Sequence, residues 1–211
     1  NASMGYMHES ANDGLFVDGR FLTGDLARQD SDGYFWMTGR AKDLIIRGGN
    51  NIDPKGIEDV LTEHPAVELA AAVGQPDSYA GELPCAFVSL DEDFKLAADD
   101  ASLEALAEEL QAFAKERVSE RAAAPVHVAI LDEMPLTAVG KIFKPSLVAM
   151  AIERVLGEAL QPLDANLSLS VVNDKRLGML ATVGNLGDSE ADRERVRAVL
   201  DKFTVKYELA A

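Results

Sequence analysis

Lys141 is the residue of this sequence best placed to bring a positive charge to an anionic substrate. It ends an expected exposed loop from Asp132 to Lys141, which contains Met134-Pro135-Leu136-Thr137 and closes with Gly140-Lys141. A lysine on such a loop can place its ammonium on a phosphate or a carboxylate. The alternative is an ordinary surface lysine, because Gly140-Lys141 lacks the earlier glycine and the following serine or threonine of a nucleotide-binding P-loop.

The carboxylate of Asp25 is a second candidate, since Thr23-Gly24-Asp25 forms a tight turn between two short β-ribbons. A fixed carboxylate can accept two hydrogen bonds from the vicinal hydroxyls of a ribose, as acidic residues do in dinucleotide-binding folds. It can equally cap its own turn. The charged cluster Gly39-Arg40-Ala41-Lys42-Asp43 follows where the ribbon region ends, and by itself it reads as an exposed linker.

The glycine-rich turn Arg47-Gly48-Gly49-Asn50-Asn51 is a third candidate. Its bare backbone would let a ligand approach closely, and Arg47 could bind a phosphate. A plain turn is the alternative. The sequence contains no Gly-x-Gly-x-x-Gly loop, no Gly-x-Ser-x-Gly elbow and no Cys/His cluster with zinc spacing, so we expect neither a dinucleotide fold nor a metal site.

Taken together, the order and separation of these segments resemble the adenylate-forming superfamily, which contains acyl-CoA synthetases, luciferases and peptide-synthetase adenylation domains. The resemblance covers roughly residues 3 to 148, which correspond to the end of a large N-terminal domain, a hinge and a small C-terminal domain. The matching motifs are, in chain order, Thr23-Gly24-Asp25, Asp32-Gly33-Tyr34-Phe35, Gly39-Arg40-Ala41-Lys42-Asp43, Ile46-Arg47-Gly48-Gly49-Asn50-Asn51-Ile52, Gly81-Glu82-Leu83-Pro84 with Ala86-Phe87-Val88, and Pro135-Leu136-Thr137 with Gly140-Lys141.

Enzymes of this superfamily join a carboxylic acid to AMP from Mg-ATP, release pyrophosphate, and let the CoA thiol attack the acyl-adenylate. The resemblance implies that Asp25 holds the ATP ribose hydroxyls and that Arg40 assists at the ribose and phosphate. It places Lys42 at the hinge about which the C-terminal domain rotates between the half-reactions. Lys141 matches the lysine that bridges the substrate carboxylate and the α-phosphate. Acetylation would remove that charge, so we also expect Lys141 to be a modification target.

For the second half-reaction, the resemblance implies that the Gly48-Gly49 turn replaces Lys141 at the site and lines the tunnel for the pantetheine arm of CoA. Arg47 and Lys55 flank this turn, and we expect them to contact the CoA phosphates. The expected cofactors are therefore ATP or AMP, CoA and Mg²⁺, with Mg²⁺ bound mainly through the N-terminal domain.

Two positions depart from the family pattern. Lys144 stands three residues after Lys141, where most members carry arginine, and Met134 precedes Pro135, where most carry leucine. Neither position touches the expected chemistry. The phosphate loop, adenine pocket and acyl tunnel of the family belong to an N-terminal domain that this sequence lacks. We therefore interpret the chain as a fragment whose partner is its own N-terminal domain, and we expect it to be inactive alone.

The implied function is that of the C-terminal part of an AMP-forming acyl-CoA synthetase acting on a fatty or other hydrophobic acid. One alternative is an adenylation domain that loads an acyl-carrier protein, although carrier proteins are typically acidic and a formal net charge of −16 would repel them. Another is a non-catalytic interaction module that keeps the fold, which the retained Asp25, Lys42 and Lys141 disfavour.

Composition narrows the possible partners. Of the 211 residues, 20 are Lys or Arg and 36 are Asp or Glu, which argues against binding to nucleic acid or to anionic membranes. No apolar stretch approaches the ~20 residues of a membrane-spanning helix. Cys85 is the only cysteine, which excludes an internal disulfide and fits a reducing cytoplasm.

The elements that position these residues predict an α+β fold. Residues 1–40, broken by Asp-Gly pairs, predict short β-ribbons at the end of the N-terminal domain, and residues 41–42 are the expected hinge. Residues 43–148 are the expected C-terminal mobile domain, a three-stranded sheet flanked by helices. Its expected elements are strands at 44–46, 67–73, 84–90 and 126–131 and helices at 54–63 and 102–121.

Residues 149–211 exceed what the family's C-terminal domain needs. An expected helix at 145–160, a hairpin of 167–172 and 177–183, a helix at 189–203 and a strand at 204–209 predict an α-β-β-α-β appendage. A packing appendage is the simple interpretation. A subunit contact that makes the protein a homo-oligomer is the alternative.

Overall fold

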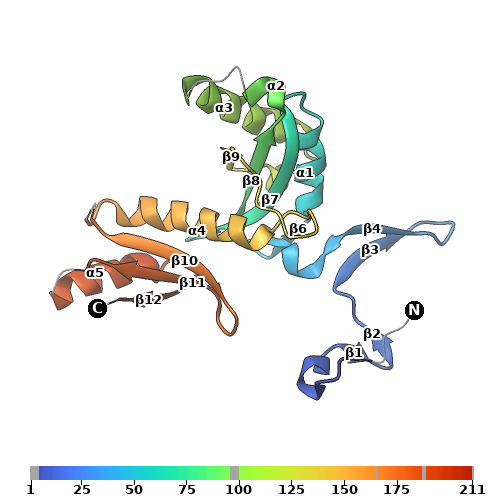
Figure 1. The fold of residues 1–211 in the computed structure, drawn as a ribbon, viewed down its shortest axis with the longest axis horizontal. Coiled ribbons are helices and arrows are strands. Elements are labelled where there is room, and N and C mark those ends of the chain that lie inside the picture. Colours follow the sequence, from blue (N-terminus) through green and yellow to red (C-terminus); the bar gives the residue numbers. More distant parts are fainter. Residues whose placement is uncertain (1–4, 96–99, 165, 187–188, 211) are drawn as a thin grey trace. The chain divides into compact units, whose positions relative to one another are not determined.

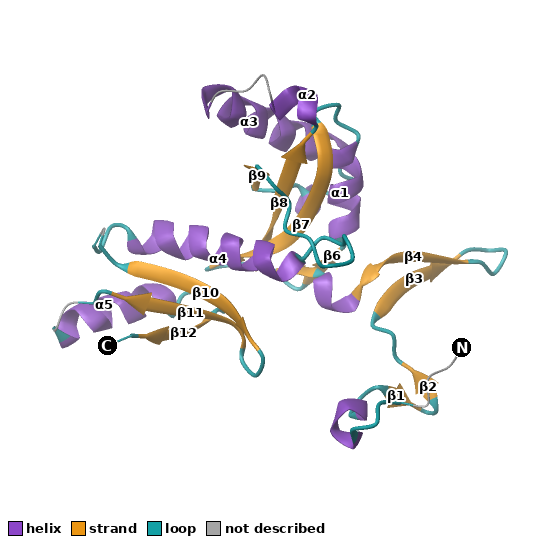
Figure 2. Cartoon of the chain, viewed as in Figure 1, coloured by secondary structure: helices purple, strands orange, loops and turns teal. Residues whose placement is uncertain are grey.

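The computed structural model describes residues 5–95, 100–164, 166–186 and 189–210, and its mixture of helices and small sheets confirms the α+β class (Figures 1 and 2). Contacts divide the chain into two units, residues 1–44 and residues 45–211. The predicted hinge at 41–42 lies within a short 3₁₀ helix, η2 (Ala41–Asp43), just before this division. The hinge and the domain borders stay predictions.

The first unit consists of two antiparallel ribbons, as the Asp-Gly pairs predicted. After the 3₁₀ helix η1 (Glu9–Asn12), β1 (Phe16–Val17) pairs with β2 (Arg20–Phe21), and β3 (Asp25–Gln29) pairs with β4 (Phe35–Arg40). One carboxylate organises the β3–β4 turn: Asp30 Oδ1 accepts from the Tyr34 amide at 2.9 Å, and Asp30 Oδ2 accepts from Trp36 Nε1 at 2.7 Å. These hydrogen bonds hold the pKa of Asp30 below its usual value.

The second unit is built on a five-stranded sheet, so the prediction of three strands is wrong. The strands β5 (Ile45–Arg47), β6 (Asn50–Ile52), β7 (Val67–Asp77) and β8 (Gly81–Leu90) run in the order β6-β5-β8-β7, and β9 (His127–Leu131) pairs in parallel with β8. Strands at 44–46, 67–73, 84–90 and 126–131 were expected as elements and correspond to β5, β7, β8 and β9, but the sheet was expected to hold only three strands. β6 was not expected, because its three residues are too few to show strand periodicity.

Alternate residues of the long β7–β8 pair face two different helical layers. Ala70, Ala72 and Val88 point to a core shared with α1 (Pro54–Thr62) and α3 (Asp100–Arg117). The helix predicted at 102–121 corresponds to α3, which ends at Arg117, four residues earlier than expected. The short helix α2 (Glu92–Lys95) precedes α3, and the 3₁₀ helix η3 (Arg121–Ala123) follows it. Asp53 caps α1, since its carboxylate accepts the Lys55 amide at 3.0 Å.

The other face of β7 and β8 is covered by α4 (Lys144–Leu160). Leu147 and Ala151 of this helix pack against the sheet, while Leu156 and Leu160 belong to a separate core. That core also includes α5 (Glu190–Leu200) and the inner faces of β10 (Ser168–Asp174), β11 (Gly178–Gly184) and β12 (Lys206–Leu209). Within the second unit, α4 thus joins the C-terminal extension to the five-stranded sheet (Figure 2).

Candidate functional site

The loop that carries Lys141 is closed by its own backbone. The Thr137 amide donates to the Lys141 carbonyl at 2.7 Å, and the Lys141 amide donates to Thr137 Oγ1 at 3.1 Å. Gly140 has φ +74°, which the turn requires and which glycine adopts without strain. The Lys141 side chain is exposed, and its ammonium makes no ion pair within the described residues. The structure therefore presents this cation on a defined turn.

The loop was predicted to be exposed, and most of its residues are, but its base is buried. Met134 is only 7% exposed and packs in one apolar cluster with Leu147 of α4. The Phe143 amide donates to the Pro135 carbonyl at 2.7 Å, which closes the base. Next to the lysine, in contrast, the side chain of Val139 is 79% exposed. The packing explains how a methionine can take this position, because its flexible apolar chain fills the core.

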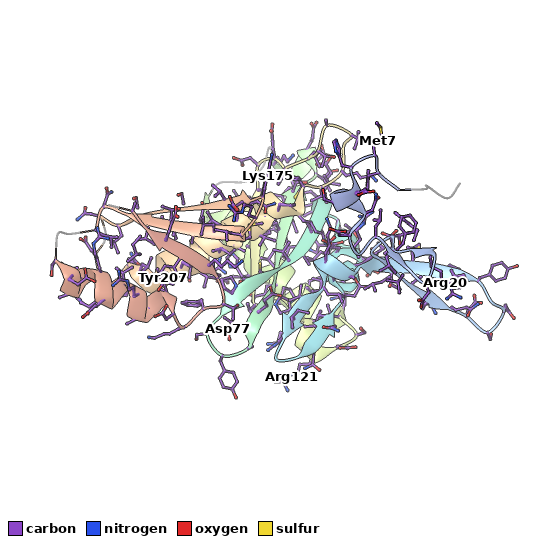
Figure 3. The ribbon with its side chains drawn as sticks, turned by 90° about the horizontal axis from the view of Figure 1, so that it is seen from below. Met7, Arg20, Asp77, Arg121, Lys175 and Tyr207 are labelled. Carbon is purple, nitrogen blue, oxygen red and sulfur yellow. The ribbon has the colours of Figure 1, made fainter. Side chains whose placement is uncertain are left out.

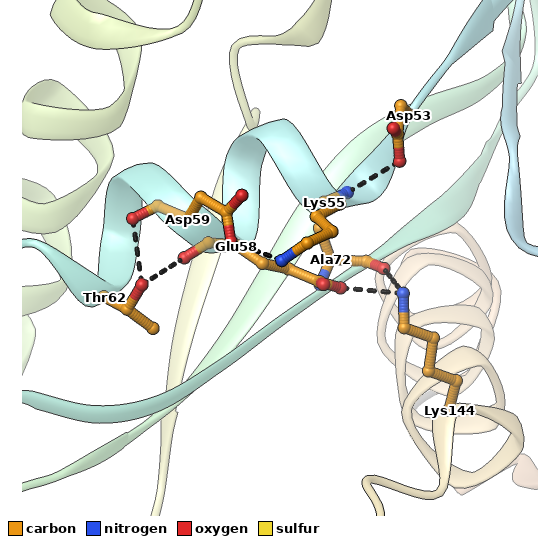
Figure 4. Close-up of polar contacts among 7 residues, drawn as sticks. All are labelled: Asp53, Lys55, Glu58, Asp59, Thr62, Ala72 and Lys144. Carbon is orange, nitrogen blue, oxygen red and sulfur yellow. Dashed lines mark hydrogen bonds and ion pairs between the residues drawn. The ribbon is translucent and has the colours of Figure 1, made fainter. Parts of the chain in front are cut away.

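Lys144, the second departure from the family pattern, ties the loop to the body of the unit (Figure 4). Its ammonium lies 2.7 Å from Glu58 Oε1 of α1 and donates to the Ala72 carbonyl of β7 at 3.2 Å. Glu58 also accepts the Ala72 amide at 3.0 Å. Because Lys144 is the first residue of α4, these contacts fix the point where the Lys141 loop ends.

In the first unit, the two residues predicted to bind ATP lie side by side. Asp25 and Arg40 face each other in the β3–β4 register, and Arg40 Nε lies 3.1 Å from Asp25 Oδ1. Thr23 Oγ1 accepts the Asp25 amide at 3.1 Å, which fixes the start of the strand. Both side chains are partly exposed, so the carboxylate is accessible to a ligand.

The predicted glycine turn is the two-residue loop of the β5–β6 hairpin. Arg47 and Asn50 are register partners, and Gly48 and Gly49 between them have φ +54° and +85°. Positive values at both positions identify the turn type whose twist matches paired strands. A Cβ atom at either glycine would meet nothing within 4 Å. The glycines are therefore required by the backbone, and the surface beside them is open.

The two basic residues predicted to bind CoA phosphates already have protein partners. Arg47 Nη1 donates to the Ala122 carbonyl of η3 at 2.7 Å and is half-buried. Lys55 Nζ lies 2.6 Å from Asp59 Oδ1 one turn along α1, and this hydrogen bond raises the pKa of Lys55 (Figure 4). The structure brings Arg47 to the turn but leaves both cations engaged.

Tyr79 and Arg121 belong to segments that contact the glycine turn, and nothing in the sequence singled them out. The Gly48 amide donates to the Ala80 carbonyl at 2.8 Å, which brings the β7–β8 turn against the glycine turn. The Asp77 carboxylate shapes that turn, and Tyr79 at its tip is 98% exposed. Arg121, next to Ala122, is exposed in η3 (Figure 3 marks Asp77 and Arg121). Only the pairing of distant segments places an aromatic ring and a guanidinium here.

The remaining reactive side chains show no sign of activation. Burial raises the pKa of the Cys85 thiol to about 12, so it stays protonated and unreactive. Burial, and then the charge of Arg154, lower the pKa of His127. Among the described residues, no group of three or more His, Cys, Asp and Glu side chains could hold a metal ion. No helix in that part of the chain is long and apolar enough to cross a membrane.

Comparison with known proteins identifies the family to which the second unit is similar. Residues 56–141 match the family described as AMP-binding enzyme C-terminal domain. Marinolic acid–CoA ligase of Pseudoalteromonas sp. is 44% identical over 94% of this chain, and the chain spans 29% of that protein. A medium/long-chain-fatty-acid–CoA ligase of Mycobacterium tuberculosis is 43% identical over 64% of the chain, which spans 23% of it.

A solved structure shows the same fold. It is o-succinylbenzoate CoA synthetase of Bacillus subtilis in complex with its acyl-adenylate intermediate, with 35% identity and a TM-score of 0.56 over 67% of this chain and 27% of the other. The same enzyme has also been solved with ATP and magnesium. We conclude that residues 56–141 form an AMP-binding enzyme C-terminal domain and that the chain belongs with the C-terminal parts of adenylate-forming acyl-CoA ligases.

Proposed function

We propose that this chain is the C-terminal part of an AMP-forming acyl-CoA synthetase that acts on a fatty or other hydrophobic carboxylic acid. In the first half-reaction, a carboxylate oxygen attacks the α-phosphorus of ATP and pyrophosphate leaves. In the second, the CoA sulfur attacks the acyl carbon and AMP leaves. The names of the relatives support the choice of acid, since two of them act on marinolic acid and on medium- and long-chain fatty acids.

Lys141 is the proposed catalytic residue of the first half-reaction, and the observation that carries this is its presentation. The closed Thr137–Lys141 turn fixes the lysine backbone, while the ammonium is exposed and has no protein partner in the described part of the chain. It can therefore bond both the substrate carboxylate and the α-phosphate. Two anions must meet in this step, and a cation between them lowers their repulsion as charge develops.

Asp25 and Arg40 are the proposed contacts to the nucleotide. Arg40 Nε forms an ion pair with Asp25 Oδ1, so Asp25 Oδ2 can accept a hydrogen bond from a ribose hydroxyl. The remaining guanidinium N–H groups of Arg40 can reach a phosphate. Lys42, two residues further on in η2, is the proposed hinge. Rotation about it between the half-reactions would replace Lys141 at the site by the Gly48-Gly49 turn for the attack of the thiol.

ATP bound here would need groups that the described residues do not supply. Among them, no group of three or more His, Cys, Asp and Glu side chains could hold a metal ion, and we propose that Mg²⁺ is bound mainly through an N-terminal domain. When bound, the metal would neutralise the phosphates of ATP. Because the chain spans 29% of the related marinolic acid–CoA ligase, we propose that an N-terminal domain completes the site and that the fragment alone is inactive.

The test is Lys141→Ala in the full-length protein. We expect the rate of acyl-AMP formation, measured as pyrophosphate release, to fall by about 10²–10³-fold. Losses of this size are typical when one group that stabilises developing charge is removed. Thioester formation from supplied acyl-AMP should be nearly unchanged. The control Lys141→Arg keeps the charge and should retain part of the first step. Equal loss of both half-reactions would contradict the proposal.

Replacing CoA by an acyl-carrier protein as the acceptor in the same assay tests the alternative acceptor. Transfer to the carrier alone would favour an adenylation domain.

The exposed Lys141 ammonium also remains the proposed acetylation site, and mass spectrometry of cell-derived protein would detect this modification. Homo-oligomer formation through residues 149–211 and a cytoplasmic location stay predictions; sizing chromatography with and without those residues tests the first.

A further inference from the structure

Few strand pairs join the glycine turn to the rest of the second unit. Its hairpin, β5–β6, has three residues in each strand, and β5 joins the main sheet through one register pair, Arg47 with Gly81. An isolated two-stranded hairpin of this size is marginally stable in water. Other contacts must therefore fix where the turn lies.

Ile45 and Ile52 of the hairpin are buried in the main core, and three polar contacts of the hairpin are present among the described residues, one of which differs in kind. The Gly48 amide donates to the Ala80 carbonyl, and the Ile46 amide donates to Glu82 Oε2, each at 2.8 Å. Both of these go to the neighbouring strand or its turn. The third, from Arg47 Nη1 to the Ala122 carbonyl at 2.7 Å, leaves the sheet and reaches η3.

η3 is a firm anchor for that bond. Ala123 within it is 8% exposed and belongs to the main core, and the Val126 amide just beyond donates to the Pro84 carbonyl of β8 at 2.8 Å. Gln111 of α3 also donates to the Pro125 carbonyl at 3.2 Å. An arginine bonded to this segment transmits the rigidity of the core to the glycine turn.

We propose that Arg47 is a positioning residue that fixes the Gly48-Gly49 turn against η3, and that it does not bind the phosphates of CoA. The guanidinium suits this, because a half-buried hydrogen bond from a charged donor is stronger than a neutral one. The effect on turnover rests on the proposed function. The effect on the turn itself does not.

The first test is amide hydrogen exchange on the 211-residue chain, in which Arg47→Met removes the bond but keeps the apolar stem. We expect amides over 45–52 to exchange about tenfold faster, the change that matches loss of one such bond. Arg117→Met, which removes a guanidinium lying over Phe113 of α3, is the matched control and should leave these amides unchanged. Unaltered exchange in Arg47→Met would overturn the proposal.

The second test uses the full-length protein, supplied acyl-AMP, and two thiols: CoA and pantetheine, which lacks the nucleotide and its phosphates. A positioning role predicts that Arg47→Met lowers kcat by about the same factor, near tenfold, with both thiols and leaves the KM for CoA close to that of the unmutated protein. A rise in KM for CoA that is absent with pantetheine would identify a phosphate ligand and overturn the proposal. If the unmutated protein made no thioester, the proposed function would fail, while the exchange experiment would still decide the role of Arg47.

Discussion

The two units of this chain differ in how far they bury their large apolar side chains. In residues 5–10 and 12–44 no side chain is buried, and Tyr34, Phe35 and Met37 of the β3–β4 hairpin are all at least 60% exposed. In the second unit, by contrast, three apolar clusters enclose fully buried residues such as Leu61, Leu147 and Leu156.

This difference separates the proposed site into parts of unequal independence. Lys141 and the glycine turn rest on a unit with its own core, so their local geometry is set within this chain. Asp25 and Arg40 rest on ribbons in which no described side chain is buried. Large apolar side chains exposed in this number are typical of a contact with another protein surface. We therefore expect the nucleotide half of the site to depend on the proposed N-terminal domain.

The largest test of the comparison replaces one large apolar residue in each unit. Leu61→Ala, at a fully buried position, should lower the free energy of unfolding by about 3 kcal/mol, because the loss of burial is joined by a cavity. Phe35→Ala, at a position 71% exposed, should change it by less than about 0.5 kcal/mol. Urea denaturation of the 211-residue chain measures both. Equal losses would break the comparison.

A smaller effect separates two ion pairs of similar length, both in Figure 4. Lys144 and Glu58 lie 2.7 Å apart with 21% and 20% of their side chains exposed, whereas Lys55 and Asp59 lie 2.6 Å apart with 54% and 62% exposed. Lys144→Met should cost about 2 kcal/mol because it strands a half-buried carboxylate. Lys55→Met should cost at most about 0.5 kcal/mol.

The same denaturation experiment measures these two variants, and Lys144→Arg supplies the control, since arginine keeps the positive charge beside Glu58. It should recover most of the loss. Similar costs for Lys144→Met and Lys55→Met would show that burial does not distinguish the pairs.

The smallest effect on stability is expected in the first unit. Arg40→Met removes an exposed pair with Asp25, so the free energy of unfolding should change by less than about 0.5 kcal/mol. In the full-length protein the same change should raise the KM for ATP by about tenfold, the size of one lost charged hydrogen bond. A stability loss comparable to that of Lys144→Met would show that the ribbons have a core of their own.

Features encoded by neighbouring residues could be predicted from the sequence. Asp53 followed by Pro54 signalled the start of α1, and Asp32-Gly33 signalled the β3–β4 turn, because caps and turns depend on residues within one or two positions. The resemblance to the adenylate-forming superfamily, carried by short motifs in chain order, made Asp25, Arg40 and Lys141 the candidate residues. The sheet was expected to have three strands and has five, and β6 was not expected at all because so short a strand exists only through its pairing.

Roles that depend on distant partners were decided by the tertiary structure alone. From the sequence, we expected Arg47 to be available for a phosphate, and Lys144 to be a departure from the family pattern that does not touch the chemistry. Folding brings Arg47 to the Ala122 carbonyl and Lys144 to Glu58, in each case from more than seventy positions away in the chain. A side chain's type and spacing determine what it can bind. Only the packing of remote segments determines which of those bonds it has already made, because each N–H group that donates within the protein leaves one fewer for a ligand.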